Sequence, residues 1–191
     1  MKKQIAWLFS VVALVLALGS AKVEANSIPL DGTWTILDEF MSPGDSFLGV
    51  DGTGLFKFSS TDHVRFTITD LFVVSDQFSV YDNGVLVFTT PAMPDWPALG
   101  FSDPFDSPPF TKLPDVALNS GFFSSMVWIF APGDHSLEIK DIHIPPFDAE
   151  GKVTFPDGTV AFKADVVPEP GVLSLLGLGL VGVWAARRRS A

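Results

Sequence analysis

The stretch His63-Val-Arg-Phe-Thr-Ile-Thr69 decides the fold class of this chain. Val64, Phe66 and Ile68 alternate in it with polar or charged residues. Successive side chains of a β-strand point to opposite faces, so this alternation predicts a strand with one buried and one solvated face. Such strands are typical of antiparallel sheets, and no long stretch around it carries the 3.6-residue apolar period of a helix.

Two segments are predicted to form β-hairpins, each with a glycine-containing turn between runs of β-forming residues. The turns are Asp82-Asn83-Gly84, between residues 78–80 and 85–89, and Pro156-Asp157-Gly158, between residues 152–155 and 159–166. Asparagine or aspartate followed by glycine suits the left-handed backbone of a tight hairpin turn. Two hairpins without a helix again favour antiparallel sheets.

The remaining predicted strands bring the total to about eight. Phe122–Phe130 is apolar on both faces, which predicts a central strand covered on both sides. Thr33–Leu37, Leu55–Phe58 and Leu137–Lys140 are shorter candidates. Because so many strands in one domain need two packed layers, we predict an all-β, antiparallel two-sheet β-sandwich of jelly-roll-like type over residues 26–166.

The segment Pro91–Pro114 interrupts this pattern, because seven of its 24 residues are proline. Proline cannot donate to a β-ladder, so we predict a long ordered loop here. Its aromatic residues Trp96, Phe101 and Phe105 are candidate ligand-binding residues, since long loops often bind ligands. The alternative is a structural flap that closes one end of the core.

Composition limits the partners of the domain. Residues 26–170 contain 6 basic and 21 acidic residues, a net charge of −15, which disfavours nucleic acid and anionic lipid as partners. The chain has no cysteine, which excludes disulfides and thiolate metal sites. Its 18 phenylalanines and 5 tryptophans supply the buried area that must stabilise the domain instead.

The N-terminus has the order of a secretory signal peptide. Lys2 and Lys3 precede an apolar core over residues 5–18, and small residues follow it. Signal peptidase could cut after Ala25 or after Ala21, and we predict a signal peptide over residues 1–25. A retained N-terminal anchor is the alternative.

The C-terminus carries a second signal, in three parts. Val167, Pro168, Glu169 and Pro170 precede an apolar segment at 171–186, and Arg187, Arg188 and Arg189 follow it. As a helix the 16-residue segment reaches roughly 24 Å, enough for a thin bilayer. The arginines predict a cytoplasmic stop, which puts the rest of the chain outside the inner membrane.

This tail, residues 167–191, resembles the PEP-CTERM sorting signal of exported bacterial proteins. The resemblance implies processing by an exosortase, a membrane-embedded enzyme that cuts near the Pro-Glu-Pro element, and transfer to the cell surface or extracellular matrix. Segments 76–84 and 128–137 are also similar to segments common among exported PEP-CTERM proteins, and through them to galactose-binding-like β-sandwiches in strand pattern only. No binding residue follows from that second likeness.

The sequence contains few candidate residues for catalysis or for binding a metal ion. Common nucleophile, zinc and phosphate-binding motifs are absent from the sequence, so we predict no enzyme and no cofactor. Calcium is the best ligand candidate, because Asp76 with Asp82 and Asn83, or the turn 51–54, supplies oxygen donors. Turn geometry explains the same residues equally well.

Three functions remain open: a structural or adhesive surface protein, which we favour, a carbohydrate-binding module of the exopolysaccharide matrix, and a secreted hydrolase. The second predicts an exposed platform at Trp96, and the third predicts two carboxylates that converge in a cleft.

Overall fold

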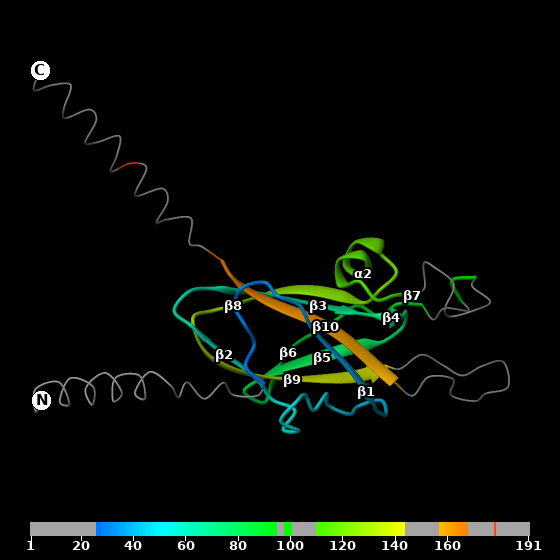
Figure 1. Cartoon of the computed structure of the whole chain (residues 1–191), viewed down its shortest axis with the longest axis horizontal. Coiled ribbons are helices and arrows are strands. Elements are labelled where there is room, and N and C mark those ends of the chain that lie inside the picture. Colours follow the sequence, from blue (N-terminus) through cyan, green and yellow to red (C-terminus); the bar gives the residue numbers. More distant parts are fainter. Residues whose placement is uncertain (1–25, 95–97, 101–109, 144–156, 168–177, 179–191) are drawn as a thin grey trace, which may run out of the picture.

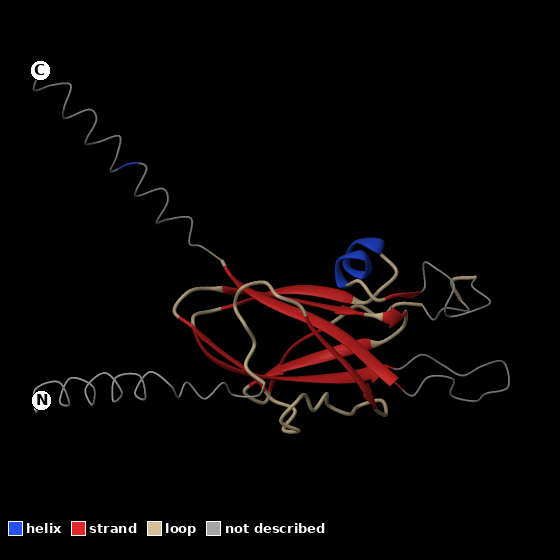
Figure 2. Ribbon diagram, in the orientation of Figure 1, coloured by secondary structure: helices blue, strands red, loops and turns tan. Residues whose placement is uncertain are grey.

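Ten β-strands and one short helix make up the part of the chain that the computed structural model describes, residues 26–94, 98–100, 110–143, 157–167 and 178 (Figure 2). The elements are β1 Thr35–Phe40, β2 Phe56–Ser60, β3 Val64–Asp70, β4 Phe72–Val73, β5 Gln77–Asp82, β6 Val85–Thr89, β7 Phe110–Thr111, α2 Pro114–Ser120, β8 Ser125–Phe130, β9 Gly133–His143 and β10 Asp157–Val166. All ladders between these strands are antiparallel. The predicted antiparallel β fold is therefore confirmed, whereas the predicted signal helix and membrane helix lie outside the described residues, Leu178 apart.

Two four-stranded sheets form the body of the domain, in the orders β1-β10-β3-β8 and β2-β9-β5-β6 (Figure 1). The chain changes sheet at each connection between these eight strands except the β5–β6 hairpin. The two sheets share one core, so they face each other as two layers. β4 and β7 form a separate two-stranded sheet.

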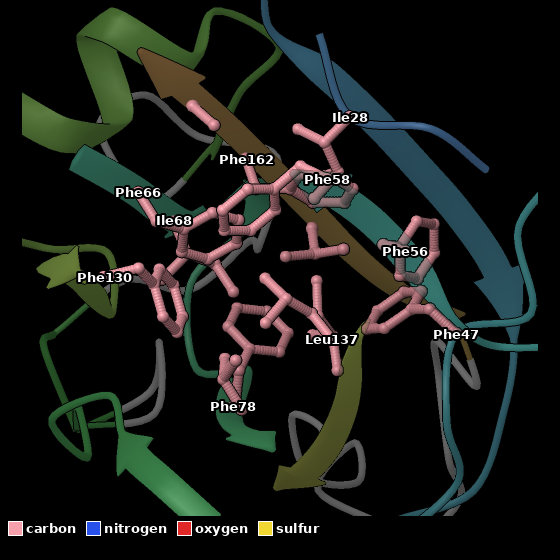
Figure 3. Close-up of a cluster of buried hydrophobic side chains, with 14 of the residues drawn as sticks. Ile28, Phe47, Phe56, Phe58, Phe66, Ile68, Phe78, Phe130, Leu137 and Phe162 are labelled. Atoms are coloured by element: carbon pink, nitrogen blue, oxygen red, sulfur yellow. The ribbon is translucent and has the colours of Figure 1, made fainter. Parts of the chain in front are cut away.

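Phenylalanine rings fill the space between the layers (Figure 3). The Phe58 and Phe130 rings, from opposite sheets, meet edge to face at 5.6 Å between centroids. Phe162 from β10 lies 5.1 Å from the Phe56 ring and 5.8 Å from the Phe66 ring. Since each fully buried phenylalanine contributes about 1.5–3 kcal/mol, such rings can hold a domain together without disulfides.

The first predicted hairpin is confirmed. β5 and β6 pair around Asn83 and Gly84, whose φ angles are 49° and 81°. Two consecutive left-handed residues are what a type I′ turn requires. The asparagine and glycine were thus a sufficient local signal for this turn.

The second predicted turn, Pro156-Asp157-Gly158, is wrong at the two residues that the structure describes, 157 and 158. Asp157 and Gly158 do not turn the chain but begin β10, where they pair with Phe40 and Glu39 of β1. The other predicted arm, residues 152–155, lies outside the described residues. Aspartate and glycine are only a local preference for a turn, and here a neighbouring strand supplies the backbone partners.

The prediction for Phe122–Phe130 is also wrong in its placement. β8 begins at Ser125 and is an outer strand of its sheet, with Val127, Trp128 and Ile129 exposed. A continuous apolar run cannot distinguish a strand covered on both faces from an edge strand with apolar residues on its outer face. Phe123, which precedes the strand, is buried in a second cluster with Leu71, Val74, Ala117 and Ala161.

One helix and a small sheet were not expected. α2 spans Pro114–Ser120 and ends at Gly121, which has a φ of 74°. Proline at the first position and glycine after the last are ordinary helix boundary signals, but seven residues are too few to show a helical apolar period. β7 lies inside the predicted proline-rich loop and pairs with β4, so part of that loop is a strand.

Candidate functional site

The C-terminal signal follows the last strand without a spacer. Val166, the last residue of β10, pairs with Val64, and the amide of Val167 donates a hydrogen bond to the carbonyl of His63 at 2.8 Å. Pro168 is the next residue in the chain. Because an extended chain advances at most about 3.6 Å per residue, the apolar segment that starts at Gly171 begins no more than roughly 14 Å from Val167.

We call this end of the domain the tail-proximal end. Three turns connect strands here: 61–63 between β2 and β3, 83–84 between β5 and β6, and 131–132 between β8 and β9. The register puts Val64 opposite both Val166 and Phe130, which places the turns 61–63 and 131–132 beside the exit of the tail. Asn83 belongs to the same end, because it donates hydrogen bonds to the carbonyls of Asp134 and Ser136 near the start of β9. Proline, glutamate and arginine of the sorting signal itself, residues 168–170 and 187–189, lie outside the described residues.

A histidine and an aspartate form a partly buried pair at the tail-proximal end. His135 Nδ1 lies 2.7 Å from Asp82 Oδ2, and His135 Nε2 lies 2.9 Å from the carbonyl oxygen of Ala131. The amide of Ser136 donates to the second oxygen of Asp82 at 3.1 Å. The imidazole also stacks on the Phe58 ring, 4.7 Å between centroids. Every carboxylate oxygen of Asp82 therefore has a donor or a ring nitrogen beside it.

A shallow groove of about 340 Å³ lies next to this pair, along the paired ends of β2 and β9. Its lining combines an ammonium group, a carboxylate, an imidazole, two hydroxyl-bearing side chains and a phenylalanine: Lys57, Asp134, His135, Ser27, Ser59 and Phe58. A concave site of this volume with a few polar groups is in the range of small-ligand sites. Its polar groups suit a hydroxyl-rich ligand.

The structure does not bring the residues of the first predicted calcium site together. Asp76 precedes β5 and Asp82 ends it, so their backbones are separated by roughly 20 Å at about 3.3 Å per residue. Asp76 accepts a hydrogen bond from the amide of Thr159 at 3.1 Å. Asn83 donates to the carbonyl of Asp134 at 3.3 Å.

The second predicted donor set, in the turn 51–54, is engaged in its own turn. Asp51 accepts hydrogen bonds from the amide and the hydroxyl of Thr53, at 2.8 and 2.7 Å, and another from the side-chain amide of Asn26. The Thr53 amide lowers the pKa of the Asp51 carboxyl, since it stabilises the ionised form. Turn geometry accounts for this aspartate.

Two aspartates that the sequence analysis did not single out are buried at the opposite end of the core, which we call the distal end. Asp70 ends β3 on the inward face shared by Phe66 and Ile68, and Asp141 lies on the inward face of β9 shared by Ile139. Both aspartates have an exposed fraction of 0%. One oxygen of each, Asp70 Oδ1 and Asp141 Oδ2, has no hydrogen-bond partner.

Burial changes the protonation of both groups. Desolvation raises the pKa of Asp141 to about 7, against the hydrogen bond from the His143 amide that lowers it. Desolvation also raises the pKa of Asp70 well above its ordinary value, and the charge of Asp141 adds to this effect. The pair is thus most stable in the folded protein when it carries a proton.

Both aspartates are inaccessible, so they do not form the exposed cleft that the hydrolase hypothesis predicts. Gly158 packs against Asp141, since a Cβ there would lie 2.6 Å from Asp141 Oδ2 and 2.3 Å from Met41 Sδ. Among the described residues, no three acidic, histidine or cysteine side chains are gathered so that they could hold a metal ion.

Two predictions fall on parts of the chain that the structure does not describe. The predicted ligand platform Trp96, Phe101 and Phe105 lies there, as does nearly all of the predicted membrane segment 171–186. Within the described ranges, no helix has the length and apolar character needed to span a membrane.

Comparison with known families and structures finds one family match, the PEP-CTERM protein-sorting motif, over residues 166–189. No curated protein matches the chain. Among solved structures, the chain is similar to the pre-peptidase C-terminal domain of collagenase from Bacillus anthracis, with 11% identity over 77% of this chain and 100% of that one, at a TM-score of 0.36. It is also similar to dimeric latent PorU from Porphyromonas gingivalis, with 13% identity and a TM-score of 0.23, over 74% of this chain and 13% of that one.

The chain therefore carries a PEP-CTERM sorting motif, as its terminal residues predicted. The motif implies an exported protein that is sorted at the membrane and recognised by an exosortase. It begins at Val166, inside the hydrogen-bonded part of β10, so the signal and the folded domain meet at a single residue.

Proposed function

We propose that this protein is a non-enzymatic surface or extracellular-matrix component, a jelly-roll-like β-sandwich that is exported by its N-terminal signal and sorted through residues 167–191. The signal peptide is cut by signal peptidase after residue 25, and the segment 171–186 holds the chain in the inner membrane until an exosortase acts. The observation that carries this proposal is the sorting-motif match that starts in the last strand. The domain itself has a structural or adhesive role.

Three features of the domain support a structural role without catalysis. The core between the two sheets is filled by apolar side chains, with phenylalanine rings prominent among them. The two carboxylates that interact at the distal end, Asp70 and Asp141, are fully buried and so lie out of reach of a substrate. Asp82 and His135 hold turns of the tail-proximal end through the Ala131 carbonyl and the Ser136 amide, which is a structural use of both side chains.

A sorting experiment tests the proposal directly. The full chain is expressed in a host that has an exosortase and in the same host without it, and the surface-retained fraction is measured. The matched variants are Glu169→Ala in the motif and Glu138→Ala in β9, which removes a carboxylate far from the motif in sequence. We expect Glu169→Ala and loss of the enzyme to abolish retention, whereas Glu138→Ala leaves it unchanged. Equal retention of all forms would reject sorting by this motif.

The groove at the tail-proximal end favours one alternative function, binding of the matrix polysaccharide. Its lysine, aspartate and hydroxyl groups could hydrogen-bond sugar hydroxyls, and its volume of about 340 Å³ fits a short oligosaccharide. The test compares polysaccharide retention of Asp134→Ala, in the groove, with Asp38→Ala, on the opposite sheet. Weaker retention for Asp134→Ala alone supports binding in the groove, and weaker retention for Trp96→Ala alone supports the predicted loop platform.

A further inference from the structure

One side of the sandwich presents two uncharged outer strands. β6 has the sequence Val-Leu-Val-Phe-Thr and β8 has Ser-Met-Val-Trp-Ile-Phe. Both are outer strands of their sheets, and the rings of Phe88 and Trp128 stack at 5.6 Å, so the two edges lie against each other. We call this the open side. Apolar side chains on it, from Val85 at 68% to Trp128 at 38%, are exposed.

The other two outer strands are protected in different ways, β2 by a neighbouring segment and β1 by charged residues. The segment Asn26–Ile28 runs beside β2, where the amide of Ile28 donates to the Lys57 carbonyl at 2.8 Å and the amide of Lys57 donates to the Asn26 carbonyl at 3.0 Å. β1 carries the charged residues Asp38 and Glu39, and the Glu39 carboxylate accepts hydrogen bonds from the amides of Leu48 and Gly49 in the following loop, at 2.8 and 2.9 Å. We call this the closed side.

Neither kind of protection is found on β8 among the described residues. In the ranges that the structure describes, no loop segment and no side chain makes a hydrogen bond to the outer edge of residues 125–130. Natural proteins block exposed edges with charged residues, proline, bulges or very short strands. β8 has six residues, pairs with β3 in unbroken register, and carries neither charge nor proline.

Charge indicates what can occupy this edge. The segment 26–170 carries a net charge of −15, so a second copy is repelled wherever carboxylates face each other. β1 on the closed side carries Asp38 and Glu39, whereas β6 and β8 carry no charge. The open side is therefore the region where two copies can approach without bringing strand carboxylates together.

Strand pairing at this edge is also self-complementary. Two antiparallel copies of one strand around a two-fold axis present the same residues to each other, as an isologous interface requires. Val127 and Ile129 point away from the core, and with the two-fold axis at residue 128 Val127 of each copy would face Ile129 of the other, where apolar cross-strand pairs stabilise a ladder.

We propose that β8 pairs antiparallel with β8 of a second copy of this chain and so joins two four-stranded sheets into one continuous sheet. The pairing satisfies the open backbone edge of both copies and covers Val127 and Ile129. It does not depend on how the tail is processed. For a matrix protein, it supplies a defined contact between domains.

Single-cysteine cross-linking of the full chain tests the proposal, because the chain contains no cysteine of its own. Ile129→Cys probes the open side, and Ile36→Cys on β1 is the matched control, since the two side chains are 49% and 46% exposed. Cells that export each variant are treated with a short bis-maleimide. We expect the Ile129→Cys chain to form a covalent dimer and the Ile36→Cys chain to stay monomeric.

A blocking variant keeps the test decisive. Val127→Lys, added to Ile129→Cys, puts a charge on the outer face of β8 beside Thr67. We expect loss of the dimer with an unchanged melting temperature. The proposal is overturned if Ile129→Cys stays monomeric, if it joins to a protein of another mass, if Ile36→Cys dimerises equally, or if the lysine leaves the dimer intact in a folded chain.

Discussion

The two ends of the sandwich differ in the burial and the hydrogen bonding of their aspartates. At the tail-proximal end, both oxygens of Asp82 are matched by His135 and by the amide of Ser136. At the distal end, Asp70 and Asp141 are fully buried and each leaves one oxygen without a partner. The same side-chain type is thus a stabilising group at one end, where it is partly exposed and hydrogen-bonded, and a cost to folding at the other, where it is fully desolvated.

This difference coincides with the proposed function. The tail-proximal end continues directly into the sorting signal and lies within roughly 14 Å of the segment proposed to enter the membrane. The end of β10 before Pro168 is held there by the pairing of Val166 with Val64 and by the hydrogen bond from the Val167 amide to the His63 carbonyl. The distal end has no such connection, and its stability should vary with pH.

The largest expected effect is the response of the distal end to pH. The pKa of Asp141 is about 7 in the folded protein against 3.8 for an ordinary aspartate, so the folded state keeps this proton up to a higher pH than the unfolded state does. The stabilisation is complete below pH 3.8 and is lost as pH rises through about 7. At about 1.4 kcal/mol per pH unit, the free energy of unfolding should fall by up to about 4 kcal/mol. Urea titrations at several pH values measure this, and a flat profile would refute the assignment.

The next largest effect is expected at the tail-proximal end, from His135→Ala. The substitution leaves Asp82 Oδ2 and the Ala131 carbonyl without the imidazole and removes a ring stacked on Phe58. A partly buried carboxylate that loses its partner costs about 2–3 kcal/mol. His143→Ala, near the distal end of β9, is the control. A loss in thermal unfolding no larger than that of the control would mean that the Asp82 pair is not stabilising.

Replacing each aspartate by asparagine should have opposite signs at the two ends. Asp141→Asn removes a buried charge, so at pH 8 it should raise the free energy of unfolding by about 1–2 kcal/mol and flatten the pH dependence. Asp82→Asn weakens the contacts to His135 and Ser136 and should lower it by about 1–2 kcal/mol. Chemical denaturation of both variants at one pH makes the comparison, and effects of the same sign would remove the distinction between the ends.

The smallest effect is expected for Gly84→Ala in the β5–β6 turn. Gly84 has a φ of 81°, and nothing lies within 4 Å of an added Cβ, so the cost is backbone strain alone, about 1 kcal/mol. Gly158→Ala at the distal end should cost more, because its Cβ would meet Met41 and Asp141. Melting temperatures of the two variants check the order, and the reverse order would show that the packing around Gly158 yields easily.

Local signals in the sequence predicted much of the fold. The alternation at Val64, Phe66 and Ile68 and the Asn83-Gly84 turn each lie within a few residues, so they are visible in the sequence. The edge position of β8 depends on which strands pair, and α2 is only seven residues long, so neither leaves such a signal. The order of strands in each sheet depends on contacts between distant segments, so it could not be predicted from local patterns.

The sites at the two ends show the same limit more sharply. His135 and Asp82 are 53 positions apart in the sequence, and Asp70 and Asp141 are still further apart. The one available signal was parity: both distal aspartates continue an inward-facing row of apolar residues, where a carboxylate is unexpected. The sorting motif, in contrast, is a contiguous sequence element and was recognised from its residue order alone.

The masses of the two ends of the native exported protein test the central claim most directly. If both terminal signals are cleaved and the domain between them is exported, the mature protein recovered from the surface should begin at Asn26 and end near Pro168. A protein that keeps Arg187–Arg189 and stays in the cytoplasm would contradict the account.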